Sequence, residues 1–338
     1  MNNIWAFLPM QASTDLLGDA DALRARFQQD SYLYLPGLLD RDRVLSLRRD
    51  IVEVLAARGW LRNDEYLMNA ISVIPPLREG EDAFLEAYDA VQRIEALHGL
   101  AHEPALVEVM RQIVGPTAFP HPLKIARLAF PGNFEVSTPP HQDYPNNQGT
   151  ENLVASWIPV GDCPIEQGGL AVLRGSHRYG VLPLDRHPGA GNRQAVVPIE
   201  MLEELRWVTT DFEAGDVLLF GSTTVHASLH NASDFNMRLS VDFRYQQEGE
   251  PLTEIVLHPH FQRQTWDDVY ADWQSEEHQY YWRDLDYEVV PFEDYPLVSP
   301  EAEGPQWEEI LRHDHRINAR HDRRMARMAD ELTPQEPA

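Results

Sequence analysis

Residues 215–226 read Gly215-Asp216-Val217-Leu218-Leu219-Phe220-Gly221-Ser222-Thr223-Thr224-Val225-His226. A short apolar run between two glycines is typical of a buried β-strand, so we expect a strand from Asp216 to Phe220. The chain then leads through Gly221 to His226, and Arg238 opens the next apolar stretch. A buried strand that ends near a histidine is a candidate framework for a metal site.

Further short β-like segments surround this one, separated by clusters of Pro, Gly and Asn. Several short strands at this spacing favour a sandwich or barrel. The segments are Leu123–Phe130, Leu153–Val160, Leu170–Leu173, Trp207–Asp211 and Met237–Tyr245.

The first 115 residues have a different pattern. Asp40 is a plausible N-cap for a helix that runs to about Arg58, because apolar residues recur there at helical spacing. Other helices are expected over Asp19–Gln28, Phe84–Ile94 and Leu106–Ile113, with a strand over Ser31–Leu35. Helices first and strands afterwards predict an α+β fold in which N-terminal helices pack on a β core.

We therefore expect one domain over residues 1–250, with the N-terminal helices packed on the β core, and an extension over residues 251–338 that packs on it. The extension is rich in Trp, Tyr and His, and an arginine-rich helix is expected over residues 309–328.

Composition excludes several classes of protein. The 338 residues carry a formal net charge of −26, which argues against nucleic acid as a partner. Cys163 is the only cysteine, so no intramolecular disulfide is expected. No basic leader and no apolar run of about 18 residues is visible, which predicts a cytoplasmic protein without a membrane span. The acidic charge also favours neutral or cationic small-molecule substrates, and a monomer or homodimer is expected.

His141 and Asp143 form a candidate metal motif. In a strand, residues i and i+2 project to the same face, so an imidazole and a carboxylate would lie side by side. A third ligand from a neighbouring strand would complete a two-histidine, one-carboxylate triad, the set that binds Fe(II) and leaves positions open. Fourteen histidines and 26 aspartates predict about one His-x-Asp by chance, so the motif depends on its context. The pairs His258/His260 and His313/His315 are less favoured rivals.

Two cationic groups could bind an anionic cosubstrate. Arg238 and Ser240 would share one face of a strand, and an arginine fork beside a hydroxyl suits a carboxylate. Lys124 is the only lysine beside 27 arginines and lies in an apolar run. It could contact the cosubstrate or substrate, or extend from a strand edge to solvent.

Several ordered motifs resemble the phytanoyl-CoA dioxygenase family of Fe(II)/2-oxoglutarate oxygenases. The resemblance spans Phe27 to Tyr245. It is carried by Gln29-Asp30-Ser31-Tyr32-Leu33-Tyr34-Leu35-Pro36-Gly37-Leu38-Leu39, by Pro140-His141-Gln142-Asp143, by Trp157-Ile158-Pro159-Val160 with Gly168-Gly169-Leu170 and Gly175-Ser176-His177, by Gly215–Phe220 with His226, and by Asn231 with Arg238.

The resemblance implies a double-stranded β-helix core of jelly-roll or cupin-like type and a set of site residues. His141, Asp143 and His226 would bind iron, and Arg238 with Ser240 would bind 2-oxoglutarate, with Arg244 as a less favoured rival. Candidate substrate contacts are Tyr144, Asn146, Trp157 and Arg244.

The implied cofactors are Fe(II), 2-oxoglutarate and O₂, and the implied reaction is hydroxylation of an unactivated C–H bond of a small molecule: a secondary metabolite, an amino acid or an acyl derivative. Related halogenases replace the carboxylate ligand with a small residue, so Asp143 favours oxygenation. Desaturation, epimerisation or cyclisation by the same iron centre remains an alternative. A non-catalytic metal-binding sensor or scaffold is an alternative of another class.

Overall fold

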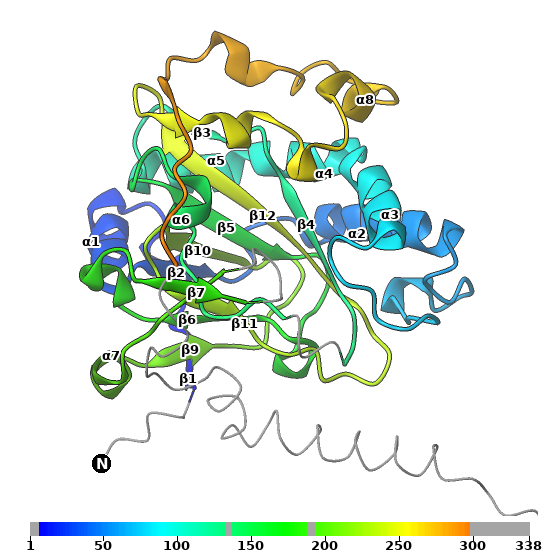
Figure 1. Cartoon of the computed structure of the whole chain (residues 1–338), viewed down its shortest axis with the longest axis horizontal. Coiled ribbons are helices and arrows are strands. Elements are labelled where there is room, and N and C mark those ends of the chain that lie inside the picture. Colours follow the sequence, from blue (N-terminus) through cyan, green and yellow to red (C-terminus); the bar gives the residue numbers. More distant parts are fainter. Residues whose placement is uncertain (1–6, 133–136, 188–192, 298–338) are drawn as a thin grey trace, which may run out of the picture.

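The computed structural model describes residues 7–132, 137–187 and 193–297. Two β-sheets face each other, and helices cover the outer face of the larger one (Figure 1). The six-stranded sheet has the order β2-β10-β5-β12-β3, with β4 also paired to β12, and all its pairings are antiparallel. The four-stranded sheet has the order β1-β9-β6-β11, in which only β1 is parallel to its neighbour.

The bounds of these strands are as follows. The larger sheet contains β2 (Tyr32–Leu35), β3 (Ala118–Pro120), β4 (Ile125–Ala129), β5 (Val154–Pro159), β10 (Val217–Gly221) and β12 (Arg238–Gln247). The smaller sheet contains β1 (Leu8–Pro9), β6 (Leu170–Leu173), β9 (Trp207–Thr209) and β11 (His226–Ser228).

Strand β10 shows how the apolar pattern builds two layers of core. Successive side chains of a strand point to opposite faces of the sheet. Val217 and Leu219 pack with the helices, whereas Leu218 and Phe220 pack between the two sheets. A continuous apolar run is needed here because both faces of the strand are covered.

Four helices form where the apolar periodicity predicts them. They are α1 (Ala20–Asp30), α2 (Arg41–Ala57), α3 (Asp82–Gln92) and α5 (Pro104–Ile113). The five-residue helix α4 (Glu95–Gly99) was not expected. The Asp40 carboxylate accepts a hydrogen bond from the Arg43 backbone N–H, so the expected N-cap of α2 is confirmed. The mixed α and β fold with antiparallel sheets is likewise confirmed.

Short elements were not expected from the sequence. They include α6 (Tyr144–Asn147), α7 (Ile199–Glu204), β7 (Leu184–Arg186), β8 (Arg193–Ala195) and the three-residue strand β11. Elements of three to six residues carry too little periodicity to be recognised, and contacts with neighbouring segments determine them.

Residues 251–297 add β13 (Leu252–Thr253), α8 (Trp266–Tyr270) and β14 (Val289–Val290). Trp266, Val269, Tyr270 and Trp282 form a small aromatic core of their own. The expected helix over 309–328 and the pair His313/His315 lie outside the described residues.

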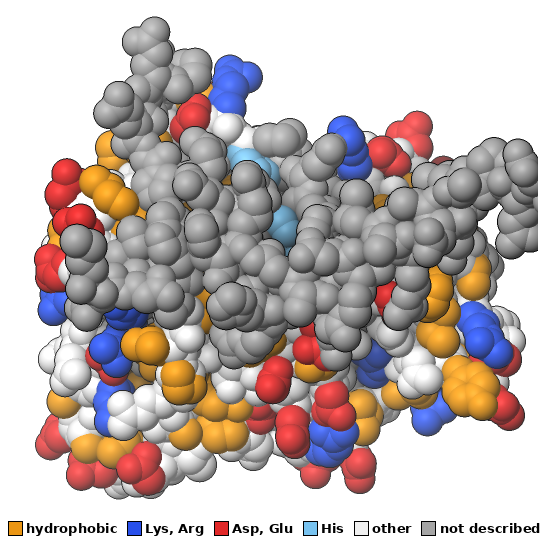
Figure 2. Space-filling view, turned by 90° about the horizontal axis from the view of Figure 1, so that it is seen from below, with side chains coloured by type: hydrophobic (Ala, Val, Ile, Leu, Met, Phe, Trp, Pro, Cys, Tyr) orange, Lys and Arg blue, Asp and Glu red, His pale blue; other side chains and the backbone are white. Residues whose placement is uncertain are grey.

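Two surface properties bear on the partner predictions. Within the described residues, no helix is long and apolar enough to cross a membrane. On the part of the surface that Figure 2 shows in colour, acidic and basic side chains are interspersed, and no broad Lys and Arg cluster is seen there.

Candidate active site

His141 and His226 are brought together by backbone pairing. His226 begins β11, and His141 forms an isolated antiparallel bridge with it. The His141 backbone N–H donates to the His226 carbonyl at 2.9 Å, and the reverse bond is 3.0 Å long. The two imidazole centroids are 4.1 Å apart. Residues 85 positions apart in the chain thus present adjacent rings.

Both imidazoles have the same tautomer, set by the main chain. His141 Nδ1 is 2.8 Å from the Pro139 carbonyl oxygen, and His226 Nδ1 is 3.0 Å from that of Thr224. A carbonyl oxygen only accepts hydrogen bonds, so each Nδ1 carries the hydrogen and each Nε2 retains its lone pair. Burial lowers the pKa of His141 to about 3 and also lowers that of His226. Both rings are therefore neutral and suited to bind a metal.

Asp143 lies beside the two imidazoles, but its backbone conformation differs from the one that the sequence predicted. The expectation that His141 and Asp143 lie on one strand is wrong: the chain leaves the bridge after His141, and Asp143 is the N-cap of α6 with helical φ and ψ of −73° and −31°. Its Oδ1 still lies 4.0 Å from the Nε2 atoms of both His141 and His226.

The donor set of these three residues fits a divalent transition metal. The ligand atoms of His141, Asp143 and His226 all lie within 4.8 Å of one another, and no other such group occurs within the described residues. Two imidazole nitrogens and a carboxylate oxygen on one side of a point leave further coordination positions open. His258 and His260 do not join such a group: the His258 ring lies near Glu254, and His260 hydrogen bonds to the Tyr88 hydroxyl.

Arg244, on β12, orients the Asp143 carboxylate. Its Nε donates to Oδ2 and its Nη2 to Oδ1, both at 3.1 Å, in a bidentate pair that is almost fully buried. Burial alone would raise the pKa of Asp143, but the charge and the hydrogen bonds of the adjacent Arg244 guanidinium hold that pKa well below its usual range. The carboxylate is therefore ionised and fixed in orientation.

Arg238 also lies on β12, six residues before Arg244 and on the same face. Its Nη1 donates to Ser240 Oγ at 2.7 Å, its Nη2 to Ser228 Oγ at 2.8 Å and its Nε to the Gly168 carbonyl at 3.1 Å. Trp157 Nε1 donates to the same Ser240 hydroxyl at 3.0 Å. The guanidinium is thus rigidly held with two hydroxyls around it, as a carboxylate anchor requires.

One cavity connects the arginine cluster with the histidines. Its open space is narrow, ≈ 30 Å³, so a bound cosubstrate requires side chains to shift. The cavity is lined by Arg127, Thr138, His141, Trp157, Leu170, Phe220, His226, Ser228, Arg238, Asp242 and Arg244.

Asp143 and Ser240 are not part of this lining but contact residues that are, the two histidines and Arg238 respectively. Other candidate residues lie outside the lining without such contacts. Lys124 is buried, but its ammonium group donates to the His121 carbonyl and, at 3.0 Å, to the Tyr281 hydroxyl. Burial lowers its pKa well below the ordinary value. Tyr144 and Asn146 belong to α6 and are likewise not part of the lining.

Arg127, by contrast, lines the cavity and was not among the predicted site residues. Its Nε donates to Asp242 Oδ2 at 2.8 Å. Asp242 and Ser228 were also missed. Each lies two residues from a predicted site residue on the same strand, and this i, i+2 relation could have identified both.

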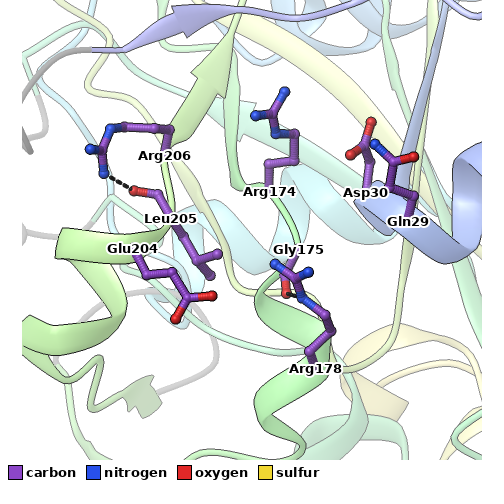
Figure 3. A pocket seen from close by; sticks show the side chains of 8 residues that line it. All are labelled: Gln29, Asp30, Arg174, Gly175, Arg178, Glu204, Leu205 and Arg206. Carbon is purple, nitrogen blue, oxygen red and sulfur yellow. Dashed lines mark hydrogen bonds between the residues drawn. The ribbon is translucent and has the colours of Figure 1, made fainter. Parts of the chain in front are cut away.

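A larger hollow of ≈ 270 Å³ lies elsewhere and contains none of the predicted site residues. Figure 3 shows Arg174, Arg178 and Arg206 around it, together with Asp30 and Glu204. Arg206 donates to backbone carbonyls at the end of α7, and Arg178 donates to the Gly175 carbonyl. These contacts give both arginines a structural role, so we place the chemistry in the narrower cavity.

Comparison with known proteins agrees with this geometry. The phytanoyl-CoA dioxygenase (PhyH) family profile matches residues 27–240. The chain belongs to the phytanoyl-CoA dioxygenase family. The resemblance of the motifs to this family is thereby confirmed.

Curated members of the family are similar over most of their length. The chain is 28% identical over 249 residues to a 1-deoxypentalenic acid 11-beta-hydroxylase of Streptomyces arenae, covering 69% of this chain and 83% of that one. It is 26% identical over 227 residues to an ectoine dioxygenase of Nocardia farcinica, covering 62% and 72%. Among solved structures, the epimerase SnoN in complex with Fe3+, alpha ketoglutarate and nogalamycin RO is 21% identical, with a TM-score of 0.49 and coverage of 69% and 86%.

Proposed function

We propose that this protein is an Fe(II)- and 2-oxoglutarate-dependent oxygenase that hydroxylates an unactivated C–H bond of a small molecule. One observation carries the proposal: the ligand atoms of two neutral imidazoles and an ionised carboxylate lie within 4.8 Å of one another, and both imidazoles line the cavity that also contains the rigid Arg238 anchor. Membership of the family and the names of the two curated relatives, a hydroxylase and a dioxygenase, support it.

We propose further that the two facing sheets form a double-stranded β-helix. The support is the arrangement of eight or more short strands in two sheets, with an apolar layer between them. In such a sandwich, the ends of strands from both sheets converge on one interior point. His226 would come from the smaller sheet, and Arg238 and Arg244 from the larger one.

Each residue of the cavity then has a role. His141, Asp143 and His226 hold Fe(II) through Nε2, a carboxylate oxygen and Nε2. Arg238 and Ser240 bind the distal carboxylate of 2-oxoglutarate, and Ser228 supports the guanidinium from the smaller sheet. Iron with 2-oxoglutarate and O₂ supplies the oxidising chemistry, whereas the protein orients the reactants and excludes water.

The substrate is proposed to be a small molecule such as a secondary metabolite, because the cavity is narrow and the two relatives named above have small molecules in their names. Desaturation, epimerisation or cyclisation would use the same residues, since the outcome depends on how the substrate is placed.

The test is succinate formation from 2-oxoglutarate in the presence of Fe(II), ascorbate and O₂. We expect slow succinate release without substrate, and its loss in Asp143→Ala. The matched control is Arg174→Met, which removes a charge from the unrelated hollow and should leave the rate unchanged. A wild-type protein that binds iron but forms no succinate would instead be the non-catalytic sensor, and a fully active Asp143→Ala variant would refute the triad.

A further inference from the structure

The guanidinium of Arg244 has one nitrogen that the protein does not use. Nε and Nη2 bind the Asp143 carboxylate, but the buried Nη1 finds no hydrogen-bond acceptor among the described residues. The residue is only 4% exposed, so water does not readily replace the missing partner. A buried donor without an acceptor costs free energy, and such a group in a cavity wall indicates that a ligand completes it. Arg244 is part of the cavity wall.

The charges around the cavity favour an anion as that ligand. Three guanidinium groups (Arg127, Arg238 and Arg244) face two carboxylates (Asp143 and Asp242). Fe(II) and doubly anionic 2-oxoglutarate would cancel each other's charge, so one positive charge remains in excess.

Among the described residues, a further acidic group, Glu79, lies 3.4 Å from Arg127. It approaches from outside the lining, and its side chain is 29% exposed, so solvent weakens its effect on the interior.

We propose that Arg244 is a specificity-determining residue that binds a carboxylate of the substrate through Nη1. The assignment rests on the proposed function and names its substrate class: small carboxylic acids. It replaces the expectation, drawn from the net charge of −26, that neutral or cationic molecules are preferred, because the field inside a pocket is set by nearby charges. Since the same guanidinium orients Asp143, a substrate acid bound to Nη1 would directly contact the group that holds the metal-binding carboxylate.

The experiment uses the full chain loaded with Fe(II) and 2-oxoglutarate without O₂. The visible charge-transfer band of that complex reports cosubstrate occupancy and responds to a molecule placed beside the iron. The probes are cyclohexanecarboxylate and the uncharged cyclohexanecarboxamide, which share a carbon skeleton. We expect the acid to perturb the band with a dissociation constant about 10-fold lower than that of the amide, as a charge-assisted hydrogen bond provides.

Variants then locate the preference. In Arg244→Met the acid and the amide should bind equally, and in Arg244→Lys part of the preference should remain because the charge is kept. Arg127→Met is the matched control in the same cavity and should retain most of the preference. Loss of the preference in Arg127→Met, but not in Arg244→Met, would transfer the role to Arg127 and overturn the assignment.

The wild-type comparison is decisive even if a variant fails to fold. Three outcomes would overturn the role of Arg244 while leaving the proposed function intact. The acid and the amide could bind equally, neither could bind, or the band could disappear because the acid displaces 2-oxoglutarate. Failure to form the band at all removes the proposed function, and this assignment with it.

Discussion

Replacing Arg238 by methionine should weaken 2-oxoglutarate binding about 100-fold while leaving the metal ligands in place. Methionine keeps most of the length of the side chain but removes the charge and all three donors, which now bind Gly168, Ser228 and Ser240. The guanidinium is fully enclosed, and burial lowers its pKa, so its interaction with a carboxylate is not screened by water.

The 100-fold loss of affinity follows from the hydrogen-bonded charge pair that the variant lacks. A hydrogen-bonded pair involving a charged group contributes about 1.5–3 kcal/mol, and removing one partner leaves the cosubstrate carboxylate buried without its counter-charge. About 2.7 kcal/mol corresponds to a 100-fold change in the dissociation constant. Arg238→Lys should lose about 10-fold, because the charge is retained but the fork is not.

The assay is an anaerobic titration of the Fe(II)-loaded protein with 2-oxoglutarate, followed by the charge-transfer band. Iron affinity is measured separately, and Arg174→Met serves as the charge-removal control far from the cavity. If Arg238→Met binds iron normally and its 2-oxoglutarate dissociation constant changes less than about 3-fold, the anchor is another residue of the lining, and Arg127 and Arg244 are the two that remain.

Three further outcomes are expected. Lys124→Met should change the 2-oxoglutarate dissociation constant by less than about 2-fold from the wild-type value, because the ammonium group contacts His121 and Tyr281 rather than the cavity. A 10-fold loss of affinity in the same titration would show that Lys124 contributes to cosubstrate binding. Gly168→Ala should lower the free energy of unfolding in urea by about 3 kcal/mol, since φ is +79° and a Cβ would lie 2.5 Å from the Leu229 carbonyl oxygen. The control Gly59→Ala, with φ +73° and open space around the residue, should lower it by only about 1 kcal/mol. Equal losses in the two variants would contradict this account. The free energy of unfolding should fall as the pH is lowered from about 6.5 towards 3, because histidines of the unfolded chain then bind protons whereas three buried rings of the folded chain stay neutral. The loss is up to about 1.4 kcal/mol per pH unit for each ring. A urea midpoint that is unchanged between pH 7.5 and 5 would count against this reasoning. The rings concerned are His98, His121 and His260, whose pKa values burial lowers to about 3.

Much of the fold could be predicted because the apolar pattern is strong over long segments. The helix after Asp40 and the strand before His226 both follow from periodicity and from the residues at their ends. The short strand β11 could not be found in this way. It spans only three residues, and pairing with β6 and the bridge to His141 determine it.

The candidate site was predictable in its residue types but not in its local geometry. The motif His141-x-Asp143 suggested an extended strand, whereas Asp143 caps a helix whose second residue is Pro145. Proline fits the first turn of a helix, because its missing N–H has no partner there in any case, and this signal favoured a helix start at Asp143. Lys124 was singled out for its rarity, which says nothing about where a side chain points, and its ammonium group contacts His121 and Tyr281.

One strand, β12, determines much of the chemistry, and its sequence explains why its register is secure. Leu239, Val241, Phe243 and Tyr245 point into the helix-covered core, whereas Arg238, Asp242 and Arg244 line the cavity and Ser240 is hydrogen bonded to Arg238 on the same face. A shift of one residue would bury four polar side chains among the helices and expose four apolar ones to the cavity, at a cost of many kcal/mol. The anchor for the cosubstrate and the arginine that orients the metal carboxylate are therefore fixed relative to each other by the hydrophobic face of the same strand. It follows that substitutions such as Val241→Asp should disrupt both functions together, although Val241 lies on the other face of the sheet.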